Sequence, residues 1–75
     1  MAGGGAAIRK HSVVLAGHRT SVSIEDAFWN ALKAFAAADG RSLNDLVGEV
    51  DRAREGNLSS ALRVYVLERL TAPRT

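Results

Sequence analysis

The sequence predicts a small, mainly α-helical domain in which one β-strand precedes three helices. Residues 18–24 alternate between polar and mostly β-branched side chains, which is typical of a strand with one buried face. Apolar residues then recur at helical spacing in three segments, at about 25–38, 42–55 and 58–71. A chain of 75 residues forms one domain. We expect it to occupy residues 9–72, after a flexible Gly/Ala-rich start at 1–8 and before a tail at 73–75.

The strand has two chemically different faces. Apolar or β-branched side chains lie on one face and polar ones on the other: Thr20, Val22 and Ile24 against Arg19, Ser21 and Ser23. A β-prone stretch, Ser12–Leu15, comes just before it. This stretch either extends the strand or folds back on it as a hairpin through Ala16-Gly17, and the sequence leaves both alternatives open.

Start and stop signals bound each helix. Candidate starts are Glu25-Asp26 for the first helix, Ser42 for the second, and either Asn57 or Ser59 for the third. Gly40 permits the left-handed cap that ends the first helix, and Pro73 prevents continuation of the third. The expected core takes the apolar strand positions and the stripes of the first two helices: Val22, Ile24, Phe28, Leu32, Phe35, Leu46, Val47 and Val50.

A lone strand needs a partner, because its backbone N–H and C=O groups must be paired. With no second long strand predicted, the natural partner is the same strand of another copy. A two-fold homodimer would then form an antiparallel ribbon above a shared core made of the residues just named. Its open face would present Arg19, Ser21 and Ser23. Such a ribbon fits the DNA major groove, where arginine and serine can bond to base edges.

These residues resemble a known family. A strand, a short helix, the run Asp39-Gly-Arg-Ser-Leu-Asn44 and a second helix are similar to the ribbon-helix-helix DNA-binding proteins of the Arc and methionine-repressor type. The resemblance runs from about Arg19 to Ala53, and the chain looks like the short bacterial members, with an added third helix. It implies an intertwined homodimer whose base-reading positions are Arg19, Ser21 and Ser23. It also implies that Ser42, Leu43 and Asn44 hold a DNA phosphate, as helix N-termini do.

The charge distribution agrees with a polyanionic partner. The net charge of +2 divides unevenly: residues 1–23 contain three basic residues and no acid, whereas residues 24–56 carry −3. We therefore expect Arg9, Lys10 and His18 to contact phosphates. The sequence predicts a small transcriptional repressor that binds double-stranded DNA.

Several classes of function are excluded or disfavoured. The chain has no cysteine, and its two histidines, His11 and His18, match no metal-ligand spacing, so we expect no metal, no cofactor and no catalysis. No apolar run is long enough for a membrane span, and the N-terminus lacks the features of a secretory signal, so we expect a cytoplasmic protein.

A rival hypothesis is an antitoxin-like adaptor that docks a protein partner on its third helix. Residues 58–70 contain more apolar side chains than one buried stripe requires. The alternative is that this helix completes a core that is too small without it. The burial of its wide apolar face distinguishes the two.

Overall fold

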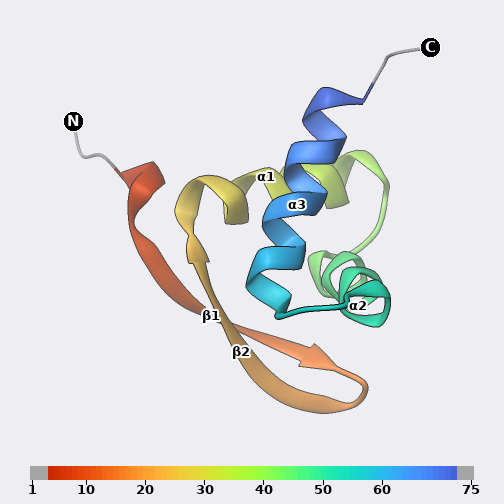
Figure 1. Ribbon diagram of the computed structural model, residues 1–75. Helices are drawn as coiled ribbons and strands as arrows, with labels where there is room; N and C mark the ends of the chain where they lie inside the picture. The colour runs from red at the N-terminus through yellow and green to blue at the C-terminus, as the bar shows by residue number, and fades with distance from the viewer. Residues whose placement is uncertain (1–3, 73–75) are drawn as a thin grey trace.

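The computed structural model describes residues 4–72, in which a β-hairpin packs against three helices (Figure 1). The elements are a 3₁₀ turn at Gly4–Ala6, β1 at Ile8–Leu15, β2 at His18–Glu25, α1 at Asp26–Ala38, α2 at Leu43–Ala53 and α3 at Leu58–Thr71. With two eight-residue strands, the fold is mixed α/β, which corrects the prediction of a mainly α fold. The predicted tail at 73–75, and the first three residues of the predicted flexible start, lie outside the described residues.

The strand β2 pairs with β1 of the same chain. The two strands are antiparallel, with Ser12 opposite Ser21, and a two-residue turn at Ala16-Gly17 joins them. Both turn residues have positive φ, 52° at Ala16 and 81° at Gly17, which suits the right-handed twist of a hairpin. Of the two alternatives for the stretch before β2, the hairpin is therefore correct. The prediction of a single strand that must pair across two copies is wrong, because β1 supplies the partner.

The predicted alternation along β2 is confirmed. Val22 and Ile24 are buried against the helices, together with Val13 of β1, whereas Ser21 and Ser23 are exposed on the opposite face. The hairpin is curved and runs past α2 to its turn (Figure 1), and β1 packs against α2. On the helix-facing side, β1 is covered as far as Leu15, which packs against the core, whereas Thr20 and His18 of β2 are exposed.

Side-chain caps begin the second and third helices. The Ser42 hydroxyl accepts a hydrogen bond from the Asp45 amide at 3.0 Å, and the Asn57 side chain accepts one from the Ser60 amide at 2.8 Å. Asn57, rather than Ser59, is thus the cap of α3. Gly40, with a φ of 69°, follows the end of α1 as predicted. The helix α2 ends at Ala53, two residues before the predicted end.

The core lies within a single chain. Ten apolar residues are buried: Val13, Val22, Ile24, Leu32, Ala36, Leu46, Val47, Val50, Leu62 and Val66. Phe28 and Phe35 are partly buried against them. Burying each large apolar side chain contributes about 1.5–3 kcal/mol. The residues expected to form a core shared between copies therefore pack within one chain, where β1 and α3 complete it.

An arginine connects the end of α3 to the end of α1. The Arg69 guanidinium donates to both carboxylate oxygens of Asp39, at 2.7 and 2.8 Å, and to the Tyr65 hydroxyl at 2.8 Å. It also lies 4.5 Å from the centre of the Phe35 ring. Within residues 4–72, no helix has the length and apolar character needed to cross a membrane.

Candidate nucleic-acid interface

The face of the hairpin that points away from the helices is polar and exposed. Across the two strands, Lys10 lies opposite Ser23, Ser12 opposite Ser21, and Val14 opposite Arg19. Directly opposed residues of an antiparallel pair lie on the same face. Since the buried valines and isoleucine occupy the other face, these six side chains form one surface, which we call the open face and which Ile8 and Glu25 continue at the base of the hairpin: Lys10, Ser12, Val14, Arg19, Ser21 and Ser23.

The open face carries two cations, Lys10 and Arg19, and one carboxylate, Glu25, at the base of the hairpin. Glu25 lies at the end of β2, and the Arg63 guanidinium donates to its carboxylate at 2.8 Å. This hydrogen bond from Arg63 holds the pKa of the Glu25 carboxyl below its usual value. An ionised but neutralised Glu25 leaves the face positive, as contact with a polyanion requires.

The N-terminus of α2 lies beside the edge of the hairpin. The Asn44 amide group donates to the carbonyl oxygen of Val14 at 2.7 Å, and its oxygen accepts from the Val14 N–H at 2.9 Å. Ser42 caps the Asp45 amide, whereas the backbone amides of Leu43 and Asn44 have no acceptor within the part of the chain that the structure describes. Unpaired amides at a helix N-terminus are the groups that bind a phosphate.

One acidic residue, Asp45, lies close to these amides and repels an anion. Asp45 lies in the first turn of α2, is exposed, and forms no ion pair among residues 4–72. Its carboxylate stabilises the helix through the dipole. The same negative charge repels a phosphate at the neighbouring amides. The start of α2 therefore attracts an anion through its backbone amides and repels it through Asp45.

The structure brings some of the sequence-predicted site residues together and separates others. Arg19, Ser21 and Ser23 share the open face, and Lys10 lies on it too. His18 is exposed beside the turn but belongs to the opposite face.

Arg9 also lies on the helix-facing side of the hairpin. Its guanidinium donates to the Asp26 carboxylate at 2.8 Å. Arg9 and Lys10, both expected to contact phosphates, thus lie on opposite faces of β1.

Sequence reasoning missed the contribution of β1 to the open face. Ser12 and Val14 belong to it only because of the hairpin register, which the alternation of β2 alone does not reveal. The other histidine, His11, has a structural role: its ring stacks on Trp29 with the ring centroids 4.0 Å apart. Among the described residues, no group of three metal-ligating side chains gathers at one place.

Comparisons with known proteins agree with this architecture. A family model described as "Ribbon-helix-helix domain" matches residues 8–70. Among solved structures, the chain is similar to an uncharacterized protein from Bordetella pertussis Tohama I, with a TM-score of 0.79 and 29% identity. The similarity covers 93% of this chain and 61% of that one, so the chain spans less than two thirds of the relative's length. No curated protein matches the chain.

The family match extends well beyond the segment that carries the resemblance in the sequence. It begins at the first residue of β1 and ends one residue before the end of α3, so the added strand and the third helix lie inside the matched domain. The chain therefore belongs to the ribbon-helix-helix family, whose members are in general non-enzymatic DNA-binding proteins and transcription regulators.

Proposed function

We propose that this protein is a sequence-specific DNA-binding regulator whose β1–β2 hairpin enters the major groove with its open face toward the bases. The observation that carries the proposal is the composition of that face, with two cations and three serine hydroxyls on a two-stranded ribbon, whose one carboxylate, Glu25, is paired with Arg63. The major groove of B-DNA admits a two-stranded ribbon. Here the ribbon is built by one chain, so it does not depend on pairing between copies.

Each side chain of the open face suits a contact with base edges. Arg19 can donate two hydrogen bonds to O6 and N7 of guanine, and the hydroxyls of Ser21 and Ser23 can donate or accept. Val14, directly opposite Arg19, is 47% exposed and suits the methyl group of thymine. Short serine side chains discriminate less than long ones, so most of the specificity depends on Arg19.

Phosphate contacts flank these base contacts. Lys10 lies at one end of the open face, His18 at the hairpin turn, and the amides of Leu43 and Asn44 beside β1. Ser42 holds these amides in place by capping α2. Arg9 contributes less than the sequence suggests, because Asp26 already neutralises its guanidinium.

The proposal also covers the oligomeric state of the protein, its effect on transcription and its cellular location. Ribbon-helix-helix proteins generally bind DNA as dimers, so we propose a homodimer that represses transcription by occluding an operator of two-fold symmetry. Binding to genomic DNA places this action in the cytoplasm of a bacterial cell. It requires no catalysis, cofactor or metal.

The test compares two charge-removing variants, Arg19→Ala and Lys33→Ala. Both side chains are exposed, but Lys33 lies on α1, outside the open face. DNA fragments that the unmodified protein retains from a genomic pool serve as the probe. Their binding is measured by fluorescence anisotropy titrations at several salt concentrations. We expect Arg19→Ala to weaken binding about tenfold and to reduce the salt slope by about 1, since one phosphate or base contact is lost. Equal affinities of the two variants would contradict the proposal.

A second candidate function rests on α3. Its side chains Val64, Leu67 and Leu70 are exposed within the chain, and exposed apolar patches mark protein-binding surfaces. This favours an adaptor that docks a different protein on α3. The decisive measurement is whether a second copy already covers these residues.

A further inference from the structure

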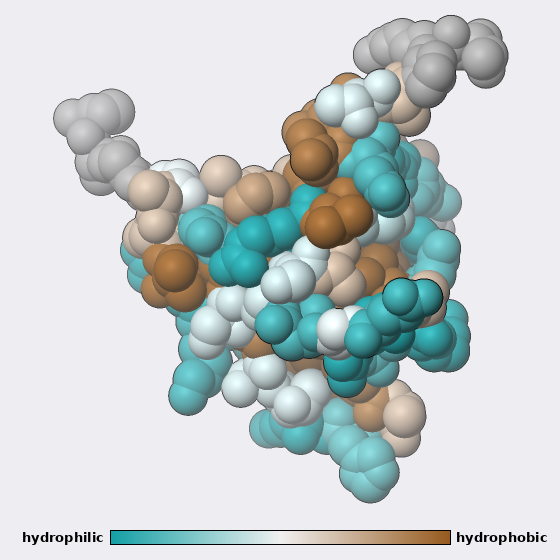
Figure 2. Space-filling model, in the orientation of Figure 1, coloured by the Kyte–Doolittle hydropathy of each residue, from teal (hydrophilic) through white to brown (hydrophobic). Residues whose placement is uncertain are grey.

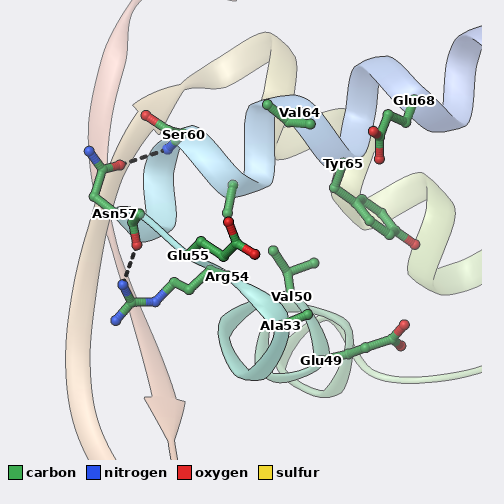
Figure 3. Close-up of a pocket in the computed structure, with 12 residues that line it drawn as sticks. Glu49, Val50, Ala53, Arg54, Glu55, Asn57, Ser60, Val64, Tyr65 and Glu68 are labelled. Atoms are coloured by element: carbon green, nitrogen blue, oxygen red, sulfur yellow. Dashed lines mark hydrogen bonds between the residues drawn. The ribbon is translucent and has the colours of Figure 1, made fainter.

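A groove of about 640 Å³ runs between α2 and α3 (Figure 3). Its apolar lining comes from both helices: Val50, Ala53, Ala61, Val64 and Tyr65. Val64 is also the first of three exposed large apolar residues of α3, and Figure 2 shows hydrophobic residues at the surface along this helix. Sites for small molecules are hollows of about 300–1,000 Å³ with mostly apolar walls. The groove therefore has the size and the lining of such a site.

The groove is also acidic. Glu49, Glu55 and Glu68 line it. Glu49 accepts a hydrogen bond from the Arg41 guanidinium, which compensates its charge. Glu55 and Glu68 are exposed and form no ion pair among residues 4–72. These two carboxylates of the groove are therefore available to a bound cation.

The groups around these carboxylates do not cancel their charge. Arg54 also lines the groove, but its guanidinium donates to the Asp51 carboxylate and to the carbonyl oxygen of Gly56. The helix α2 ends at Ala53, which is part of the lining. Carbonyl groups at the C-terminal end of a helix carry partial negative charge, which attracts cations. The groove therefore favours a positively charged ligand and disfavours DNA.

The positions of the two available carboxylates indicate the shape of that ligand. Figure 3 shows Glu55 on one side of Val50 and Val64, and Glu68 on the other. The apolar lining is therefore short and has a carboxylate at each end. A helix of a partner protein would need a continuous apolar track for anchors over two helical turns. A small molecule with an apolar centre and a cation at each end matches the groove better.

We propose that the groove between α2 and α3 binds a small diamine. Its apolar spacer packs against Val50 and Val64, and its two ammonium groups pair with Glu55 and Glu68. Exposed ion pairs are individually weak, so a preference for a diamine over a monoamine requires both carboxylates. The inference does not rest on DNA binding, because the groove and the open face have no residue in common.

The test compares diaminohexane with hexylamine, which has the same carbon chain and one ammonium group fewer. Binding to the full chain is followed at low salt by NMR, through the methyl signals of Val50, Ala53 and Val64. We expect saturable shifts at these methyl groups, and an affinity for diaminohexane about fivefold higher than for hexylamine. Adipate, a dianion of the same chain length, should not bind, because the carboxylates of the groove repel it.

Single substitutions test the two ion pairs. The variants Glu55→Gln and Glu68→Gln should each bind diaminohexane and hexylamine with similar affinity, because one ammonium group of the diamine loses its partner. Both side chains are exposed, so circular dichroism should be unchanged. Asp45→Asn is the matched control. Asp45 is exposed at the other end of α2, outside the groove, and this variant should keep the preference for the diamine.

Equal affinities of the unmodified protein for diaminohexane and hexylamine would overturn the proposal, and so would a preference that survives both substitutions. Methyl shifts that depend on protein concentration without any amine would also overturn it, because a second copy would then occupy the groove. Tighter binding of a basic amphipathic peptide at the same methyl groups would overturn it by assigning the groove to a protein segment. The measurement contains no DNA, so none of these outcomes affects the test of Arg19.

Discussion

The side chain of Asn44, near the start of α2, hydrogen-bonds to both backbone polar groups of Val14 on β1, at 2.9 Å and 2.7 Å. These groups point away from β2, and they would otherwise form part of an open sheet edge. The carboxamide acts as a short substitute for a neighbouring strand, because it offers one donor and one acceptor in the required order. It also fixes the position of the hairpin relative to the N-terminal amides of α2.

Replacing Asn44 by alanine should therefore destabilise the protein. Two hydrogen bonds of ordinary strength are lost, and each contributes about 0.5–1.5 kcal/mol. We expect the free energy of unfolding, measured by urea denaturation, to fall by about 1–2 kcal/mol. Asn30→Ala is the matched control, because Asn30 is exposed on α1 and its side chain forms no hydrogen bond within the described residues. An equal loss in both variants would show that the contact with Val14 contributes nothing.

The hairpin shows what the sequence could and could not predict. The alternation in β2 identified the strand and its buried face correctly, because Val22 and Ile24 meet the helices. The strand β1 alternates less clearly. Its helix-facing positions include Arg9 and His11, which are accommodated by an ion pair with Asp26 and by stacking on Trp29. Tertiary contacts of this kind leave no periodic signal in the sequence.

The turn between the strands offers a stabilising substitution. Ala16 has a φ of 52°, where side chains other than those of asparagine and aspartate are disfavoured. Asn-Gly is the preferred pair in turns with two positive φ values. We expect Ala16→Asn to raise the free energy of unfolding by about 1 kcal/mol, as measured by thermal denaturation. The opposite change, Gly17→Ala, should lower stability because Gly17 has a φ of 81°. A lower melting temperature for Ala16→Asn would contradict this account.

The contact between Arg69 and Asp39 predicts how stability depends on pH. The hydrogen bonds from Arg69 hold the pKa of the Asp39 carboxyl below its ordinary value of 3.8. Since the unfolded state then binds the proton more readily, this carboxylate stabilises the fold above about pH 4, and the contribution is lost as the pH falls through the folded pKa. Urea denaturation between pH 6 and pH 2 should show a smaller loss in Asp39→Asn than in the parent chain.

A direct measurement complements this comparison. In an NMR titration, Arg69→Gln should return the pKa of the Asp39 carboxyl toward 3.8, because the donor that causes the shift is removed. An unchanged titration in that variant would assign the shift to another group.

The candidate site was predictable only where local sequence patterns identify its residues. Arg19, Ser21 and Ser23 follow from the alternation of one strand, and the cap at Ser42 follows from local helix chemistry. The register of β1 depends on the turn at Ala16-Gly17, so the positions of Ser12 and Val14 required the structure.

A substitution in the first turn of α2 is expected to strengthen DNA binding rather than weaken it. Asp45 places a carboxylate beside the unpaired amides of Leu43 and Asn44, where a DNA phosphate is proposed to bind. Asp45→Asn removes that charge while keeping the size of the side chain and the amide that Ser42 caps. The variant should bind DNA more tightly by about threefold to tenfold at low salt, and the gain should shrink as salt screens the charge.

The cost of Asp45→Asn to helix stability is about 0.3–1 kcal/mol, because an acid at the start of a helix is favourable. Glu55→Gln, which removes an acid two residues beyond the C-terminal end of α2, serves as the control and should leave the affinity unchanged. A similar gain in both variants would mean that only the net charge matters, and the phosphate site at the start of α2 would have to be abandoned.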